Sequence, residues 1–135
     1  MINTQSEKAV SNVDVLFKPL TIKSLNAPNR IVMAPMTRNQ SPNNIPNDSN
    51  VEYYRKRAGG GVGLIVTEGT CVNHIAASGY PDVPYFYGED RLEAWGKVVS
   101  AVHAEGGTIA PQLWHCGGMR KKGAMPEGDV DGYTP

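Results

Sequence analysis

The feature that most constrains this chain is a regular alternation of short apolar runs with longer amphipathic stretches. Three runs are short and apolar enough to be buried β-strands, and they cover residues 31–34, 64–68 and 108–113. An amphipathic stretch with helical spacing separates each run from the next. The order strand, helix, strand, helix, strand predicts parallel strands joined by right-handed crossovers.

The sequence marks both ends of the two predicted helices. The first starts at a cap formed by Asn47 or Asp48 and ends at the glycines of residues 59–61, which accept the left-handed conformation beyond a helix. The second covers residues 89–105, with two acidic residues in its first turn. The spacing predicts two buried stripes, formed by Val51, Tyr54 and Ala58 and by Leu92, Trp95, Val98, Val99 and Val102.

The remaining segments are predicted to be a lead-in, a hairpin and loops. Residues 1–15 are expected to be a mobile polar lead-in, and residues 16–135 an incomplete domain. Residues 20–30 alternate in polarity and predict a short hairpin that turns at residues 26–29. Pro111 lacks a backbone donor, so a bulge or a strand end is expected near it.

Two α/β architectures use this order of elements, the open doubly wound sheet and the (β/α)₈ barrel. A complete barrel needs roughly 250 residues or more. The chain has 135 residues. If it belongs to a barrel, it holds about the first three β/α units, and its open sheet edges could recruit a second copy.

Composition excludes several classes of function. Lys and Arg together number 13, and Asp and Glu together also number 13, so the formal net charge is zero. A chain with no basic excess does not favour nucleic acid or an anionic membrane as a partner. The start of the chain lacks the apolar segment of a secretion signal, so we expect a cytoplasmic protein with reduced cysteines. No cysteine or histidine spacing suggests a metal site.

The carboxyl ends of the predicted strands carry the residues that could form a site. In a barrel, working residues lie at these ends, here residues 35–37, 68–70 and 112–115. The Gln112 carboxamide could bind a ligand or cap free backbone groups, and the Thr37 hydroxyl could donate to a ligand or bond its own turn. Trp114 could wall a pocket or belong to the core.

Other readings of the sequence are weaker. The glycines of residues 59–63 precede a strand, whereas a phosphate-binding glycine loop follows one. Glu68 could act as a general base, although pairing with an arginine or with backbone N–H groups is the favoured role. A thiolate at Cys116 activated by His115 is disfavoured because adjacent side chains rarely face each other.

Three segments in this order resemble the Old Yellow Enzyme family of NADH:flavin oxidoreductases. They are LFKPLTIKSLNAPNRIVMAPMTR at residues 16–38, YYRKRAGGGVGLIVTEGT at 53–70 and QLWHCGGMR at 112–120. The resemblance implies the N-terminal part of an FMN-binding (β/α)₈ barrel. It also implies hydride transfer from NADH or NADPH through FMN to an activated alkene.

The resemblance assigns roles to individual residues. It places the flavin along Ala34, Pro35, Met36 and Thr37, with Gly69 allowing close approach. Gln112 would bond the pyrimidine edge, and Trp114 would border the substrate pocket. The family's His/His or His/Asn pair and its tyrosine cannot be placed on this chain. Many members have alanine at the position of Gly69, and an arginine nearer to the motif glycine than Arg120.

Two alternatives remain open. The chain could be a non-catalytic partial-barrel module, or a fragment that needs a partner or the missing strands. It could also belong to another metabolic barrel that binds phosphorylated, sugar-like substrates, since the architecture hosts many chemistries.

Overall fold

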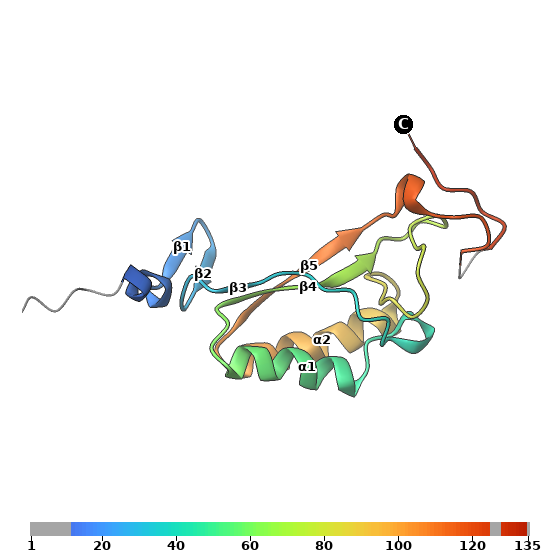
Figure 1. The fold of residues 1–135 in the computed structure, drawn as a ribbon. Coiled ribbons are helices and arrows are strands. Elements are labelled where there is room, and N and C mark those ends of the chain that lie inside the picture. Colours follow the sequence, from blue (N-terminus) through green and yellow to red (C-terminus); the bar gives the residue numbers. More distant parts are fainter. Residues whose placement is uncertain (1–11, 125–127, 135) are drawn as a thin grey trace, which may run out of the picture.

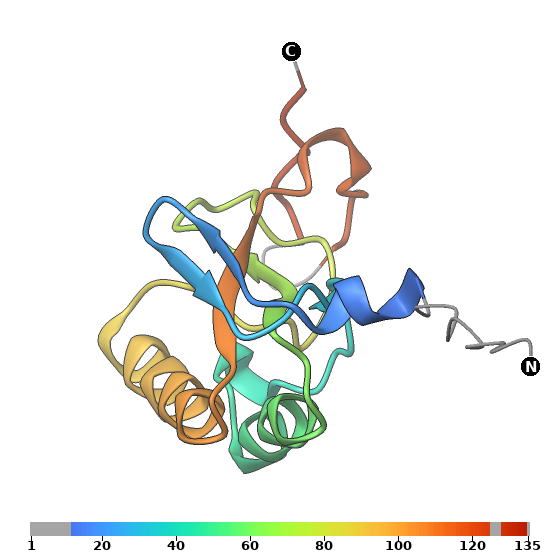
Figure 2. The same ribbon diagram turned by 90° about the vertical axis from the view of Figure 1, so that its left-hand side faces the viewer.

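A computed structural model describes residues 12–124 and 128–134 as a parallel sheet covered by two helices. The sheet has the order β3-β4-β5, formed by β3 (Val32–Met33), β4 (Leu64–Cys71) and β5 (Thr108–Trp114). Both pairings are parallel, as predicted. Helices α1 (Asp48–Gly59) and α2 (Glu89–Ala104) lie side by side on one face of the sheet (Figures 1 and 2).

The ends of α1 confirm the predicted capping. The Asn47 side chain accepts from the Ser49 backbone, and the Asn50 side chain accepts from the Asn47 backbone, so the cap is reciprocal. Gly60 caps the other end, and Gly61 follows with φ of 92°, a conformation that costs glycine little. The predicted second helix is also confirmed, with Glu105 as its C-cap.

The main core lies between the sheet and the helices. Tyr54 and Ala58 of α1, Ile65 of β4 and three residues of α2 form one buried cluster. The α2 residues are Trp95, Val98 and Val102, as the helical spacing predicted. Leu92 was predicted to belong to this stripe but is 46% exposed, and Ala94 is buried instead. In the first turns of α2 the buried face therefore includes Ala94 and not Leu92.

The strands differ from the prediction at two places. Residues 31–34 were predicted to be a strand buried on both faces, but only Val32–Met33 is a strand and Val32 is 52% exposed. The reason is that the two described helices cover a single face of the sheet (Figure 2). β4 is longer than predicted, because it continues to Cys71 and pairs with β5 as far as Trp114.

The bulge expected near Pro111 is present. Val66 pairs with Ala110 and Gly69 pairs with Gln112, so two residues of β4 face Pro111 alone. At this bulge two threonine hydroxyls bond the backbone of β5, where the regular backbone pairing between the strands is interrupted. The Gln112 N–H donates to the Thr67 hydroxyl at 3.1 Å, and the Thr70 hydroxyl donates to the Gln112 carbonyl at 3.2 Å.

The predicted hairpin exists, but its turn was placed wrongly. β1 (Leu20–Ile22) pairs with β2 (Leu25–Ala27), so the chain turns at Lys23 and Ser24, with Lys23 at φ 52°. Residues 26–27, predicted to be part of the turn, therefore lie in a strand. The hairpin lies at the end of the sheet opposite the carboxyl ends of β4 and β5 (Figure 1). Of the predicted lead-in, residues 1–11 lie outside the described residues, and Asn12–Phe17 forms the 3₁₀ helix η1.

Candidate functional site

The three predicted strand ends lie at the same edge of the sheet. β3, β4 and β5 run parallel, so their carboxyl ends lie at the same end of the sheet, where the long loops gather (Figure 1). Residues 34–37, Gly69 and residues 112–114 lie at or just after these strand ends. Residues 34–37 are all exposed, with Met36 at 62%. Residues 34–37 are therefore left uncovered by α1 and α2.

Two polar side chains at this edge have unused hydrogen-bonding capacity. Thr37 is exposed and Gln112 is half-buried. Among the residues that the structure describes, neither the Thr37 hydroxyl nor the Gln112 carboxamide bonds to another group. The Gln112 backbone is held on both sides by Thr67 and Thr70, so its side chain leaves a fixed point of the strand. The alternative role of Gln112, capping of loose backbone groups, is not seen.

Gly69 makes room for Trp114. A Cβ atom at Gly69 would lie 2.8 Å from Trp114 Cζ3 and still closer to two other indole atoms, Cδ2 and Cε3. Tyr80 stacks on the same indole, with 5.4 Å between ring centroids and an interplanar angle of 11°. Trp114 also packs against the second buried cluster, around Cys71, Ala77, Val83 and Tyr85. The predicted pocket and core roles of Trp114 are therefore compatible.

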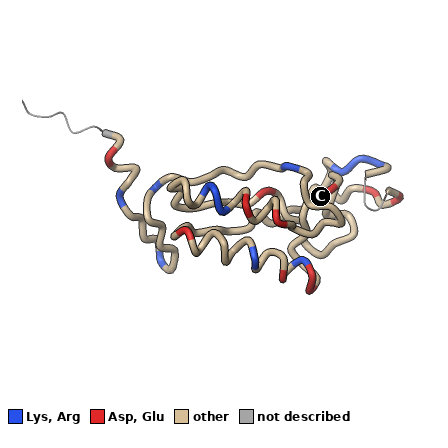
Figure 3. The backbone as a smooth tube through the Cα atoms, turned by 90° about the horizontal axis from the view of Figure 1, so that it is seen from below, with Lys and Arg blue, Asp and Glu red and all other residues tan. Residues whose placement is uncertain are grey.

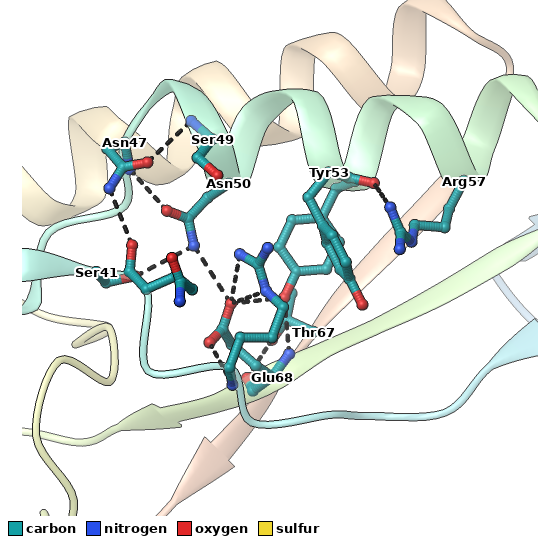
Figure 4. A network of polar contacts seen from close by, with 11 residues as sticks. Ser41, Asn47, Ser49, Asn50, Tyr53, Arg57, Thr67 and Glu68 are labelled. Carbon is teal, nitrogen blue, oxygen red and sulfur yellow. Dashed lines mark hydrogen bonds and ion pairs between the residues drawn. The ribbon is translucent and has the colours of Figure 1, made fainter.

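Glu68 is held at the centre of a buried polar network (Figure 4). Its side chain is 0% exposed and accepts from Arg38 Nε at 3.2 Å, from Arg38 Nη2 at 3.1 Å and from the Arg38 backbone N–H at 3.3 Å. Asn50 and Tyr54 of α1 add hydrogen bonds at 3.3 and 3.2 Å. The favoured role of Glu68, pairing with an arginine and a backbone N–H, is confirmed.

This network positions the loop that follows β3. Glu68 ties the backbone of Arg38, the residue after Thr37, to β4 and to α1. The Arg38 guanidinium also lies 3.7 Å from the Tyr53 ring centroid, and Arg57 covers the same ring at 3.3 Å. Burial raises the pKa of Tyr54 above its usual value, with a further contribution from the nearby Glu68 charge. Tyr54 therefore stays neutral and can donate to that carboxylate.

The disfavoured pairing of His115 with Cys116 is not seen. His115 bonds instead to His74, with 3.0 Å between ring nitrogens, and accepts from the Gly117 N–H. Cys116 is buried, and burial raises the pKa of its thiol. Burial likewise raises the pKa of Cys71 to about 11. Both cysteines are free thiols.

Sequence reasoning did not identify Tyr80 or His74 as neighbours of the strand ends. Both lie in the long loop of residues 72–88, where no periodicity indicates which side chains turn inward. The aromatic character of Tyr80 was the one available signal. Within the described part of the chain, no three potential ligands gather to hold a metal ion. No described helix is long and apolar enough to cross a membrane.

Known proteins are similar to this chain in sequence. The profile of the NADH:flavin oxidoreductase / NADH oxidase family matches residues 15–134. The flavin oxidoreductase hxnT of Emericella nidulans is 42% identical over 132 residues, covering 94% of this chain and 32% of the relative. 12-Oxophytodienoate reductase 7 of Oryza sativa subsp. japonica is 41% identical, covering 84% of this chain and 28% of its own length.

Solved structures agree with the sequence comparison. Morphinone reductase in complex with tetrahydroNAD superposes with a TM-score of 0.76 at 42% identity, covering 84% of this chain and 30% of that one. The Old Yellow Enzyme homologue from Zymomonas mobilis gives a TM-score of 0.71 at 38% identity, covering 77% and 29%.

The chain belongs to the NADH:flavin oxidoreductase / NADH oxidase family. Its fold is part of the (β/α)₈ barrel of Old Yellow Enzyme proteins, with three parallel strands and no closed barrel among the described residues. The chain spans about a third of the length of the relatives that it matches.

The residues present fit part of an FMN site. The exposed segment 34–37 leaves backbone free to contact a ring system, and the side chains of Thr37 and Gln112 have hydrogen-bonding groups that no described residue uses. The Trp114 indole occupies the space that a Cβ atom of residue 69 would fill. The predicted contact between Gly69 and the flavin therefore stays a prediction.

Proposed function

We propose that this chain is the N-terminal part of an FMN-dependent oxidoreductase that reduces an activated alkene with NADH or NADPH. The observation that carries the proposal is the alignment of residues 34–37 with Gln112 at one edge of a parallel sheet. FMN, when bound, supplies the hydride relay between the nicotinamide and the alkene. Family membership supports this cofactor and this reaction class.

The chain's own residues would bind and orient the ring system. Ala34, Pro35 and Met36 would lie along it, and the Thr37 hydroxyl would donate to it. The Gln112 carboxamide carries both donors and an acceptor, which match the alternating groups of a flavin pyrimidine edge. Gln112 suits this role because its backbone is fixed at the bulge by Thr67 and Thr70.

Trp114 would border the substrate pocket. Its indole is held between Gly69 and Tyr80, so it presents a fixed wall beside the strand ends. A flat apolar wall suits a conjugated alkene. Glu68 would contribute by positioning, since it fixes the backbone next to Thr37.

The test is FMN retention. The protein is incubated with excess FMN and desalted, and its visible spectrum is recorded. We expect retained flavin with a perturbed absorbance band, and Gln112→Ala should weaken FMN binding roughly three- to tenfold through lost hydrogen bonds. Gln40→Ala, at an exposed loop residue, is the matched control. Equal FMN affinity in the Gln112→Ala variant and the wild type would contradict the assigned role.

A second candidate is a partial flavin-binding domain that binds FMN only when further barrel strands complete it. Val32, Met36 and Leu113 are more than half exposed on the sheet and at its edge, at 52%, 62% and 58%. Such surface is usually covered by protein. Colourless protein that gains FMN affinity on addition of the family's remaining barrel strands would favour this candidate.

A further inference from the structure

A hollow whose lining includes none of residues 34–37 and Gln112 lies beside the start of α2. It has a volume of about 400 Å³ and is lined by Asn44, Asn73, His74, Ile75, Tyr85, Tyr87 and Arg91. None of these residues is acidic, and Arg91 is a permanent cation. The charged residues that Figure 3 shows elsewhere on the two helices include both signs. The lining therefore has a positive character that the helices as a whole do not share.

Arg91 has a buried donor that nothing in the described chain satisfies. Its Nε atom is buried without a hydrogen-bond partner among those residues. An unmade hydrogen bond of a buried charged group is costly, and native structures usually satisfy such groups with protein, water or a ligand. The guanidinium also lies 5.2 Å from the Tyr85 ring centroid and 5.6 Å from that of Tyr87, so two aromatic rings flank the cation.

The hydrogen bonds around His74 determine which ring nitrogen carries its proton. His115 Nδ1 accepts from the Gly117 N–H at 3.1 Å, so the neutral His115 ring carries its proton on Nε2. That Nε2–H donates to His74 Nδ1 at 3.0 Å, and the Ala76 N–H donates to the same atom at 3.2 Å. His74 Nδ1 is therefore an acceptor, and the His74 proton lies on Nε2. His74, which lines the hollow, thus carries a second donor.

The wall of the hollow beside Arg91 is aromatic and flat. Tyr85 and Tyr87 stack with 5.1 Å between centroids and an interplanar angle of 17°. Burial raises the pKa of Tyr85 to about 12, so this wall is neutral at physiological pH. Ile75 is 56% exposed at the hollow. The lining therefore combines two donor residues, one of them cationic, with aromatic and aliphatic side chains.

We propose that this hollow binds a small carboxylate ligand with a flat apolar body, its carboxylate held by Arg91 and His74 and its body against Tyr85 and Tyr87. An arginine fork matches carboxylate geometry, and a small shift of the Arg91 side chain would bring its buried, unbonded Nε–H to the carboxylate. The site uses none of the residues assigned to the proposed flavin site, so it stands whether or not the chain binds FMN.

The test is titration of the FMN-free protein with phenylacetate, followed by calorimetry and by NMR of the arginine Nε–H signals. We expect saturable binding, a shift of the Arg91 Nε–H signal, and weaker binding of acetate, which lacks the flat body. Arg91→Gln should weaken phenylacetate binding roughly tenfold or more, because a charge-assisted bond is lost. Lys97→Gln, the same charge change on an exposed residue of α2 outside the hollow, should leave binding unchanged.

His74→Ala provides a second route that does not alter α2. It removes the Nε2–H donor and should weaken phenylacetate binding while FMN retention stays as in the wild type. The proposal is overturned if phenylacetate binds no more tightly than acetate, if the Arg91 Nε–H signal does not move, or if both variants bind like the wild type. Failure of FMN retention alone would count against the proposed function and not against this site.

Discussion

Glu68→Gln should destabilise the protein far more than its modest change in shape suggests. The substitution keeps the side-chain volume but removes the charge that faces Arg38, whose side chain is only 14% exposed. Removing one partner of a buried ion pair costs about 3–5 kcal/mol, because the other charge stays buried without compensation. The new amide N–H₂ would also face donors of Arg38, Asn50 or Tyr54. A loss of this size is a large part of the roughly 5–15 kcal/mol that stabilises a typical domain.

Urea unfolding followed by tryptophan fluorescence measures the loss directly. Glu93→Gln is the matched control, because Glu93 pairs with Lys97 on the surface and is 71% exposed. The control should change the free energy of unfolding by less than about 1 kcal/mol. Arg38→Met combined with Glu68→Gln should be less destabilised than the sum of the two single variants, since the pair is lost together. A loss below about 1 kcal/mol for Glu68→Gln would refute the reasoning.

Three further predictions concern the caps, the close approach and the buried thiol. Asn47→Ala removes the reciprocal cap of α1 and should lower the free energy of unfolding by about 1 kcal/mol, measured by urea titration. Gly69→Ala should displace the Trp114 indole and cost about 1–3 kcal/mol, with an altered near-ultraviolet circular dichroism spectrum; Gly96→Ala, which meets open space, should not destabilise. Because burial raises the pKa of Cys71 from 9 to about 11, the folded state holds this proton more tightly. The free energy of unfolding should therefore fall as the pH rises from 9 to about 11, and it should fall less in the Cys71→Ala variant. The same dependence of this free energy on pH in the variant and the wild type would contradict the prediction.

The sequence predicted the helices well because each has local signals at its ends. Asn47 and the glycines at residues 59–61 act within a few residues of the backbone that they cap, so their effect does not depend on tertiary contacts. The hairpin turn was misplaced because the local residue types point to a different position from the one where the chain turns. Residues 26–29 carry the turn-forming residue types, whereas Lys23 adopts a left-handed conformation that its side chain does not favour.

The candidate site was predictable only in part. Thr37, Gln112 and Trp114 follow apolar runs, and parallel pairing brings such residues to one edge. The network around Glu68 was not predictable in detail, because its partners lie 30, 18 and 14 residues away in the sequence. The stack of Tyr80 on Trp114 likewise depends on the path of a long loop, which no local pattern determines.

Pro111 has more influence on the site than its lack of functional groups suggests. Before the bulge, β5 partners follow β4 residues by 44 positions, as Ala110 follows Val66; after it they follow by 43, as Gln112 follows Gly69. Without this change Gly69 would pair with Leu113. Since neighbouring residues of a strand point to opposite faces, a slip of one residue exchanges the side chains on each face. Because proline cannot donate to the ladder, the bulge at Pro111 sets which of Gln112, Leu113 and Trp114 meets Gly69.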